Sequence, residues 1–346
     1  MRRALITTTV NVPTNLRTWC EVGLTSQDLV IVAGDHRNSH VEVEELADEL
    51  TRTMRVPVLY LRPEDQERWT VSEALGWNCV QRRNIALLEA LDWGADTVTT
   101  IDDDNYPLTT DFFERTDSAL RGSAPHTLVS SASGWWNAGS LLDPPVTLRG
   151  FPYSQRHRQP ELTREVELVN ALQPGVVAHQ VIGDPDVDAV ERIVTRPEVR
   201  RYRADTNVVL ASGTWCPFNS QATTYTRELA PLMFVWPGVG RYDDVWASYL
   251  AQRVMQALGR HVVFGFPLVR QDRNTHDDLT DLENELYGMR YTDLVVEVLR
   301  GLDLPEDTGV WDLLGRCFAA LGSADLLPAG TLIAFATWLA DLNKVL

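Results

Sequence analysis

Lysine, cysteine and long apolar runs are what this sequence has least of. Lys344 is the single lysine among 31 basic residues, so arginine supplies nearly all of the positive charge. We attribute this bias to a GC-rich bacterial genome. Acidic residues number 48, and the formal net charge is -17. General nucleic-acid binders need a basic surface for phosphate contacts, so this balance argues against that class of protein.

The four cysteines, Cys20, Cys79, Cys216 and Cys317, are far apart and form no CxxC pair. This spacing argues against a zinc knuckle and against a disulfide scaffold. No segment reaches the roughly 18 apolar residues that cross a bilayer. The N-terminus reaches polar residues too early for the apolar core of a signal peptide. We therefore expect a cytoplasmic protein with reduced cysteines and with neither a membrane nor a nucleic acid as partner.

The length of 346 residues and the hydrophobic content of 44% allow one large α/β domain or two small ones. In the first half, β-branched runs alternate with segments of helical spacing. Strands are predicted over residues 4–10, 28–33, 56–61 and 97–101, and helices over residues 43–54 and 80–93. Strands separated by helices predict a mostly parallel sheet, with ligands bound at the carboxyl ends of the strands.

The second half is less regular. Residues 121–240 are rich in Gly, Pro, Trp and Ser, which predicts irregular strands and long loops. A helix is predicted over residues 243–258 and a further strand over 261–266. From Asp278 onward the pattern is helical, and the apolar segment 326–342 predicts a buried helix.

Three adjacent carboxylates, Asp102, Asp103 and Asp104, follow the apolar strand that ends at Ile101. They repel one another, so stability does not explain their position at the end of a buried strand. A divalent cation that bridges to a diphosphate removes the repulsion, and hard oxygen ligands suit Mg²⁺ or Mn²⁺. The alternative is a solvated acidic turn closed by Asn105.

Asp35, Arg82 and Arg83 are further candidates for nucleotide contacts. Asp35 follows the second strand, where a carboxylate can accept a hydrogen bond from a base imide or a ribose hydroxyl; the alternative is a simple turn cap. Arg82 and Arg83 lie on the helix before the aspartates and offer planar donor forks to phosphate or base oxygens. The alternative for each arginine is an exposed position on the helix.

Arg149 lies in the segment RGFPYS, whose aromatic residues suit a sugar-facing loop or an ordinary aromatic cluster. Asp243 and Asp244 open the predicted helix 243–258, where acidic residues are favoured in any case. A compact loop that contains two glycines precedes them. None of the seven histidines has metal-ligand spacing, and His276 is the strongest candidate among them.

Three segments taken together resemble one family. They are residues 100–104 (TIDDD), 149–154 (RGFPYS) and 240–247 (GRYDDVWA). In this order they are similar to the UDP-arabinopyranose mutases, also called reversibly glycosylated polypeptides, of glycosyltransferase family 75. The resemblance extends from about Leu5 to Arg270, with weaker similarity at residues 6–19, 29–35 and 185–189. Residues 83–85 and 217–220 are also similar to the STELLO-type proteins, which have a related glycosyltransferase domain.

The resemblance implies a GT-A-like α/β fold, which we expect over residues 1–276. The helical pattern that follows predicts that residues 277–346 form a helical C-terminal extension packed on it. The resemblance also implies a nucleotide-diphosphate sugar and a divalent metal, usually Mn²⁺. Gln271 stands where the plant mutases have a histidine, so His276 or a water is expected to complete the metal site. With the patterns above, this predicts metal ligands Asp102, Asp104 and His276; nucleotide contacts Thr8, Asn11, Asp35, Arg83, Asp102 and Asp103; and catalytic residues Arg149, Asp243 and Asp244.

By this resemblance, we expect a metal-dependent mutase that interconverts the pyranose and furanose forms of an NDP-sugar. The sugar is either UDP-arabinose-like or a deoxyhexose nucleotide for a bacterial natural product or glycan. Arg149 matches the arginine that the family glycosylates, but a guanidinium stays protonated and is a poor nucleophile, so we expect an electrostatic role. Asp243 or Asp244 is the expected general base.

Two other functions remain open at this stage. One is a soluble GT-A glycosyltransferase that uses the same site but passes the sugar to an acceptor. The other is a sugar-nucleotide-binding subunit without catalysis, which the intact acidic triplet argues against. The base, the sugar and a homo-oligomeric state are not determined by the sequence.

Overall fold

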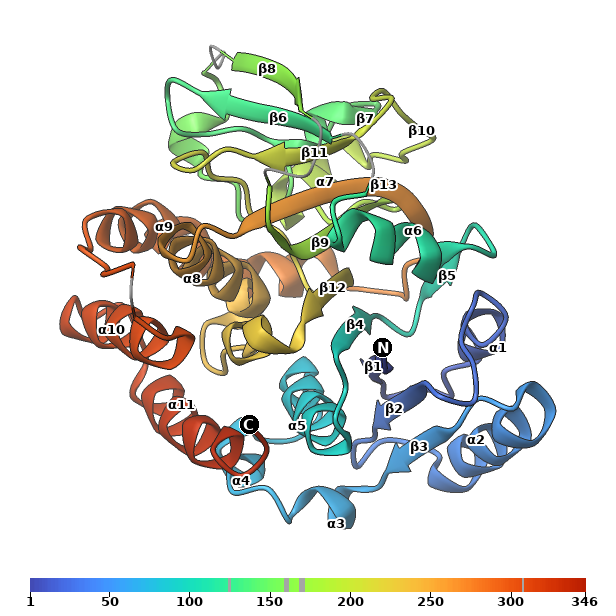
Figure 1. Cartoon of the computed structure of the whole chain (residues 1–346). Coiled ribbons are helices and arrows are strands. Elements are labelled where there is room, and N and C mark those ends of the chain that lie inside the picture. The colour runs from blue at the N-terminus through green and yellow to red at the C-terminus, as the bar shows by residue number, and fades with distance from the viewer. Residues whose placement is uncertain (124–125, 159–161, 168–171, 307) are drawn as a thin grey trace.

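The computed structural model describes the chain except for residues 124–125, 159–161, 168–171 and 307 (Figure 1). In the described part, a mixed sheet of eleven strands runs through the centre of the molecule. In spatial order its strands are β3 (Val58–Leu61), β2 (Leu29–Ala33), β1 (Arg3–Thr8), β4 (Thr97–Ile101), β12 (Ala222–Thr226), β9 (Pro174–Gly183), β13 (His261–Gln271), β11 (Asn207–Leu210), β6 (His126–Ser131) and β8 (Leu162–Glu167), with β5 (Asn105–Pro107) paired to the end of β13.

Helices cover the sheet, and short strands lie beside it (Figure 1). The strands β7 (Leu142–Asp143) and β10 (Arg201–Tyr202) form a separate antiparallel pair. The helices are α1 (Leu16–Trp19), α2 (His40–Met54), α3 (Pro63–Gln66), α4 (Val71–Leu75), α5 (Arg83–Trp93), α6 (Phe112–Leu120), α7 (Ala189–Thr195), α8 (Asp243–Ala257), α9 (Asp278–Arg300), α10 (Val310–Ser323) and α11 (Ala329–Leu342).

The N-terminal strands confirm the predicted parallel sheet. β3, β2, β1 and β4 are hydrogen-bonded in parallel, and β4 has the predicted bounds. Alternate side chains of β1 enter different apolar clusters: Leu5 packs with the cluster of α2, and Ile6 with the cluster of α5. Both faces of these strands are therefore buried, which is why they read as continuous apolar runs.

β12 reverses the direction of the sheet in its centre. It is antiparallel to both β4 and β9, so β9 and its parallel neighbour β13 run in the same direction as the N-terminal strands. Most long strands therefore agree in direction, as predicted. β13 is longer than the predicted strand 261–266, because after an irregularity between Gly265 and Val269 it continues to Gln271. This continuation brings Gln271 beside the end of β5.

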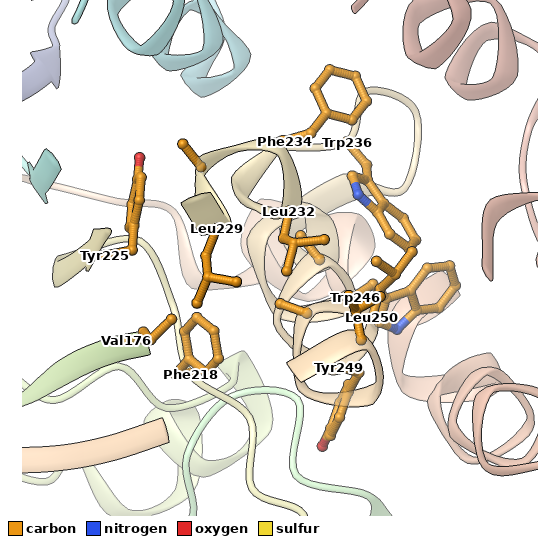
Figure 2. Packing of buried hydrophobic residues seen from close by; sticks show 14 of the residues in the cluster. Val176, Phe218, Tyr225, Leu229, Leu232, Phe234, Trp236, Trp246, Tyr249 and Leu250 are labelled. Atoms are coloured by element: carbon orange, nitrogen blue, oxygen red, sulfur yellow. The ribbon is translucent and has the colours of Figure 1, made fainter. Parts of the chain in front are cut away.

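The predicted helical C-terminal region is present as α9, α10 and α11. Its apolar residues belong to the same core cluster as those of α5 and α8. Phe318 and Phe335 stack with centroids 3.5 Å apart, and Phe234 stacks on Trp338 at 5.3 Å. Figure 2 shows part of this cluster, with the Trp236 ring near Trp246. No helix in the described ranges is long and apolar enough to cross a bilayer.

Candidate functional site

A cleft of about 1140 Å³ opens at the carboxyl ends of β1 and β4 and continues to the N-terminus of α8. This is the edge of the sheet where the parallel strands predicted a ligand. The cleft walls contain every predicted site residue except Asp35 and Arg82. Arg82 is fully buried and donates to Gln66 and Ser72. The predicted residues in the walls are Thr8, Asn11, Arg83, Asp102, Asp103, Asp104, Arg149, Asp243, Asp244 and His276.

The acid turn, residues 102–104, forms one end of the cleft. On its buried side, Nδ2 of Asn15 donates to the carbonyl oxygens of Asp102 and Asn105, at 3.1 and 3.0 Å. The backbone N–H of Asp102 donates to Asn105 Oδ1 at 3.2 Å. Asn105 thus closes the turn and is fully buried, and Asp104 is also buried, whereas Asp102 and Asp103 are partly exposed. The buried amides fix the backbone that presents the three carboxylates.

Arg83, at the start of α5, neutralises Asp102 from inside the protein. Its Nη2 donates to Asp102 Oδ1 at 2.5 Å, and its Nη1 donates to the hydroxyl and carbonyl oxygens of Ser220 at 2.5 and 3.0 Å. Burial raises the pKa of Asp102 to about 6, although Arg83 opposes the shift. The Arg83 side chain is only 4% exposed, so much of its fork is occupied by protein oxygens.

Asp103 and Asp104 share the donors of one residue, Asn274. Its Nδ2 donates to Asp103 Oδ1 at 2.9 Å, and its backbone N–H donates to Asp104 Oδ2 at 3.0 Å. Asp103 Oδ2 also accepts a hydrogen bond from Thr9 Oγ1 at 2.5 Å. Burial raises the pKa of Asp104, while the hydrogen bonds from Asn274 and Gln271 oppose this. Burial therefore makes the negative charge of Asp104 costly in the absence of a cation.

Gln271 is the second feature of the acid turn that points to a cation. It is 7% exposed, and its Nε2 lies 3.4 Å from both carboxylate oxygens of Asp104. Its Oε1 is buried and has no hydrogen-bond partner among the residues that the structure describes. In the described ranges, no group of three or more His, Cys, Asp or Glu side chains is arranged to hold a metal. A carboxylate beside an unpartnered amide oxygen nevertheless fits the oxygen ligands of Mg²⁺ or Mn²⁺.

Arg149 lies at the other end of the cleft, in a network of buried ion pairs. Its Nε and Nη2 donate to the two carboxylate oxygens of Asp186 at 2.8 and 3.0 Å, and Nη2 also donates to Asp244 Oδ1 at 3.2 Å. Its Nη1 donates to the carbonyl oxygen of Arg241. Burial disfavours the charge, but Asp186 and Asp244 outweigh it and hold the pKa of Arg149 well above its ordinary value. Arg149 is therefore a fixed cation.

Gly150 allows Arg149 to approach α8 this closely. Its φ is +83°, and a Cβ at this position would lie 2.1 Å from Val245 Cγ1. The carbonyl oxygen of Gly150 accepts a hydrogen bond from the buried Tyr249 hydroxyl at 2.9 Å. A larger residue at this position of the RGFPYS segment would clash with α8, so only glycine lets the segment pack this closely against the helix.

Asp243 and Asp244 have different environments although they are adjacent. Asp244 Oδ2 accepts from the backbone N–H and the hydroxyl of Ser220, both at 2.9 Å, and Oδ1 accepts from Arg149. Asp243 accepts from Gln81 Nε2 at 2.7 Å and from the N–H of Asp244 at 2.8 Å. Burial and the Asp244 carboxylate raise the pKa of Asp243. Asp243 is therefore the member of the pair that is suited to exchange a proton.

Asp35 is 1% exposed and lies behind the cleft wall. Its carboxylate accepts the backbone N–H groups of His36 at 2.8 Å and Cys79 at 3.2 Å. This is the turn-cap arrangement, and it holds the segment of Cys79, which does line the cleft. Of the other predicted nucleotide contacts, Thr8 donates from Oγ1 to the carbonyl oxygen of Ala33, and Asn11 lies 3.4 Å from Asp103.

His276 lines the cleft, and its Nδ1 pairs with Asp281 at 3.2 Å. Its role as a metal ligand stays a prediction. The residues that sequence reasoning missed are Asp186, Ser220, Gln81 and Asn274. Asp186 and Ser220 lie in segments that resemble known families, whereas no local signal marks Gln81 or Asn274, because each acts on a partner far away in the chain.

The comparisons with known proteins agree with the resemblance seen in the sequence. No family model matches the chain. The chain is 24% identical over 254 residues to a probable UDP-arabinopyranose mutase 2 of Solanum tuberosum, and 24% identical over 220 residues to UDP-arabinopyranose mutase 3 of Arabidopsis thaliana. These alignments cover 70% and 61% of this chain, but only 64% and 56% of the relatives. The chain thus spans less than two thirds of the length of these relatives, and its similarity to the mutases is confirmed.

Among solved structures, a mannosyltransferase of Pyrobaculum calidifontis, in complex with GDP-Man and Mn²⁺, matches 99% of this chain and 74% of its own. The identity is 11% and the TM-score is 0.42. A likeness at this level carries no argument about the reaction.

Proposed function

We propose that this chain is a metal-dependent enzyme that interconverts the pyranose and furanose forms of a nucleotide-diphosphate sugar. The observation that carries the proposal is one cleft with two chemically different ends. A crowded acid turn lies at the carboxyl end of β4, and the fixed cation Arg149 lies beside the proton-exchanging Asp243. The similarity to the mutases supports the choice of isomerisation.

The charge of the cleft supports a divalent cation. The walls hold the six carboxylates of Asp102, Asp103, Asp104, Asp186, Asp243 and Asp244, against the four guanidinium groups of Arg83, Arg149, Arg241 and Arg273. A diphosphate adds further negative charge to this excess. Because like charges at close range repel strongly in a partly desolvated site, diphosphate binding requires added positive charge.

The residues that would hold this ion are Asp102, Asp104 and the Oε1 atom of Gln271, with His276 as a further candidate. When bound, the metal would neutralise the diphosphate as a leaving group. Arg83 keeps Asp102 in place, so its contribution to nucleotide binding is indirect. Asp35 contributes in the same way, because it holds the Cys79 segment of the wall.

The chain's own groups would then serve the sugar. Breaking the anomeric C–O bond releases the diphosphate, and Arg149 stabilises the negative charge that develops there. A different hydroxyl of the sugar attacks the anomeric carbon of the cation that remains, and the bond between this carbon and the former ring oxygen then breaks. Asp243 accepts the proton of the hydroxyl that closes the ring and returns it to the oxygen that leaves the ring. The diphosphate then rebinds at the anomeric carbon, so the formula of the substrate is unchanged.

The test is incubation of the protein with a panel of NDP-sugars and Mn²⁺, without an acceptor, followed by NMR. We expect a furanose isomer of one of them, and none from Asp104→Asn. If the protein only hydrolyses the donor, or transfers sugar to an added acceptor, the mutase assignment is wrong and the glycosyltransferase alternative stands.

A further inference from the structure

We propose that Asn274 is a latch with two sets of partners. In the structure, its side-chain amide donates to Asp103 while its backbone N–H donates to Asp104; when a divalent cation binds the acid turn, the side-chain amide turns from Asp103 to the diphosphate. This inference rests on the proposed function, because it names a further residue that binds the same ligand.

The first step is the position of Asn274. It lies shortly after β13, which ends at Gln271. It bonds two members of the acid turn at once, through Nδ2 to Asp103 at 2.9 Å and through its backbone N–H to Asp104 at 3.0 Å. The backbone N–H of Asp272 donates to the carbonyl oxygen of Asp104 at 3.0 Å. The segment is therefore pinned directly over the predicted metal site.

The second step is the anchor behind it. The side chain of Arg273 is 10% exposed and donates to Asp281 Oδ2 on α9 at 2.8 Å. Asp281 also pairs with Arg241 at 3.4 Å and His276 at 3.2 Å. Residues on both sides of Asn274 are thus tied to α9. Asn274 can change its hydrogen-bond partners while the segment around it stays in place.

The third step is competition for the same lone pairs. The N–H groups of Asn274 and a divalent cation are both attracted to the carboxylate oxygens of the acid turn. A cation bound there repels the partial positive charge of these hydrogens. The donors of Asn274 then need new acceptors, since unpaired N–H groups beside a partly buried site are costly.

The fourth step is that a diphosphate needs hydrogen-bond donors in the cleft. Four arginines line the cleft; Arg83, Arg149, Arg241 and Arg273 are each paired with a carboxylate. A diphosphate therefore finds few unengaged donors among the cleft cations. The donors of Asn274 lie beside the acid turn, where a cation-bound diphosphate would sit, and they hold no other element of the fold in place.

The test measures two affinities of the purified protein by calorimetry: Mn²⁺ alone, and UDP in saturating Mn²⁺. Asn274→Ala removes the Nδ2 donor and keeps the backbone N–H. It should raise the Mn²⁺ affinity several-fold, because the carboxylate of Asp103, between the predicted ligands Asp102 and Asp104, loses a partner that offsets its negative charge. It should lower the UDP affinity by about tenfold, the scale of one hydrogen bond to a charged group. Asn274→Asp, which is nearly isosteric and adds negative charge, should shift both affinities further in the same two directions.

Asn284→Ala is the matched control. Asn284 also lines the cleft, but its Nδ2 donates within α9 to the carbonyl oxygen of Thr280, so neither affinity should change. Opposite shifts in the two Asn274 variants support the latch. If both affinities fall together, Asn274 only shapes the site, and the latch is wrong; unchanged affinities overturn it equally. If wild-type protein with Mn²⁺ binds no nucleotide at all, the proposed function fails, but a tighter Mn²⁺ affinity in Asn274→Ala still supports the competition.

Discussion

The two ends of the cleft are both rich in carboxylates. The pKa values of Asp102 and Asp104 at one end are raised, whereas that of Asp186 at the other end is lowered. At the acid turn, burial raises the pKa of Asp102 to about 6 and also raises that of Asp104. At the other end, burial also disfavours the charge of Asp186, but Arg149 outweighs it and lowers the pKa of Asp186 to about 2. At the acid turn, Arg83 pairs with Asp102 but no arginine pairs with Asp104 among the described residues, whereas Arg149 at the other end already balances Asp186.

This difference indicates that the Arg149 end is preorganised, whereas the acid turn needs a bound cation to balance its charge. The hydrogen bonds of Asp186 and Asp244 leave Arg149 little freedom, as is useful for a group that stabilises developing charge. Beside the acid turn, Gln271 Oε1 has no hydrogen-bond partner among the described residues, and the negative charge of the buried Asp104 is unfavourable without a cation. Both features favour the binding of a cation. Five predictions test this contrast, and they follow from the largest expected effect to the smallest.

Asp243→Asn removes the proposed general base at the preorganised end. We expect turnover to fall by about 10²- to 10⁴-fold, the usual contribution of a general base. The affinity for the nucleotide should change little, because the base acts in the chemical step. Steady-state kinetics and calorimetry measure the two quantities. A variant with wild-type turnover would remove Asp243 from the mechanism.

Arg149→Ala removes the fixed cation. The expected loss of turnover is about 10²- to 10³-fold, as for other preorganised donors to a developing negative charge. Arg149→Lys should not restore the rate, because lysine lacks the planar fork that bonds both oxygens of Asp186. Mass spectrometry of the wild type after incubation with NDP-sugar should show no sugar on Arg149. A stable adduct there would contradict its role as a permanently charged group.

Asp186→Asn and Asp104→Asn are the same chemical change at the two ends, with opposite expected effects on folding. The first leaves Arg149 short of a buried counter-charge, and should lower the free energy of unfolding by about 3 kcal/mol. The second relieves an unbalanced charge, and metal-free stability should stay level or rise. Chemical denaturation measures both. Equal destabilisation would erase the contrast between the ends.

Gly150→Ala tests whether the preorganised end depends on close packing against α8. The new Cβ would meet Val245, so we expect a loss of about 2–4 kcal/mol in unfolding free energy from strain and overpacking. Gly213→Ala is the control, because Gly213 has nearly the same φ, +81°, but open space around it. It should cost only about 1 kcal/mol. Similar losses in the two variants would show that backbone conformation alone matters.

The smallest effect is the pH dependence of metal-free stability. The pKa of Asp102 is about 6 in the folded protein against 3.8 ordinarily, so the folded state holds its proton more tightly between these values. The contribution of Asp102 to stability is therefore lost as the pH rises from about 4 to about 6. Asp186 acts with the opposite sign, and its contribution is lost only as the pH falls below 4 towards 2. Thermal denaturation should show that Mn²⁺ removes the loss at higher pH; an unchanged profile would argue against cation binding at the acid turn.

Much of the fold could be predicted because its signals are local. The apolar run before the aspartates predicted β4 with its bounds, and helical spacing predicted the helix that ends at Gly94. The carboxyl-end rule then placed the cleft, because parallel strands end at one edge of the sheet. Asp35 and Arg82 are the predicted site residues that lie outside the cleft wall. The carboxylate of Asp35 is used by two backbone N–H groups, and the guanidinium of Arg82 is used by Gln66 and Ser72.

The sequence by itself determined which residues are acidic and where the strands that carry them end. Only the tertiary structure decided the state of each charge. Asp102 and Asp186 are both aspartates in strand-end loops, but one meets Arg83 at a partly open site and the other is held by both Arg149 and Asn219. The hydrogen bond between Asn274 and Asp103 likewise joins two segments that are 171 residues apart in the sequence. The energy of a charge depends on burial and on neighbours within a few ångströms, and chain folding sets both over distances that no local pattern records.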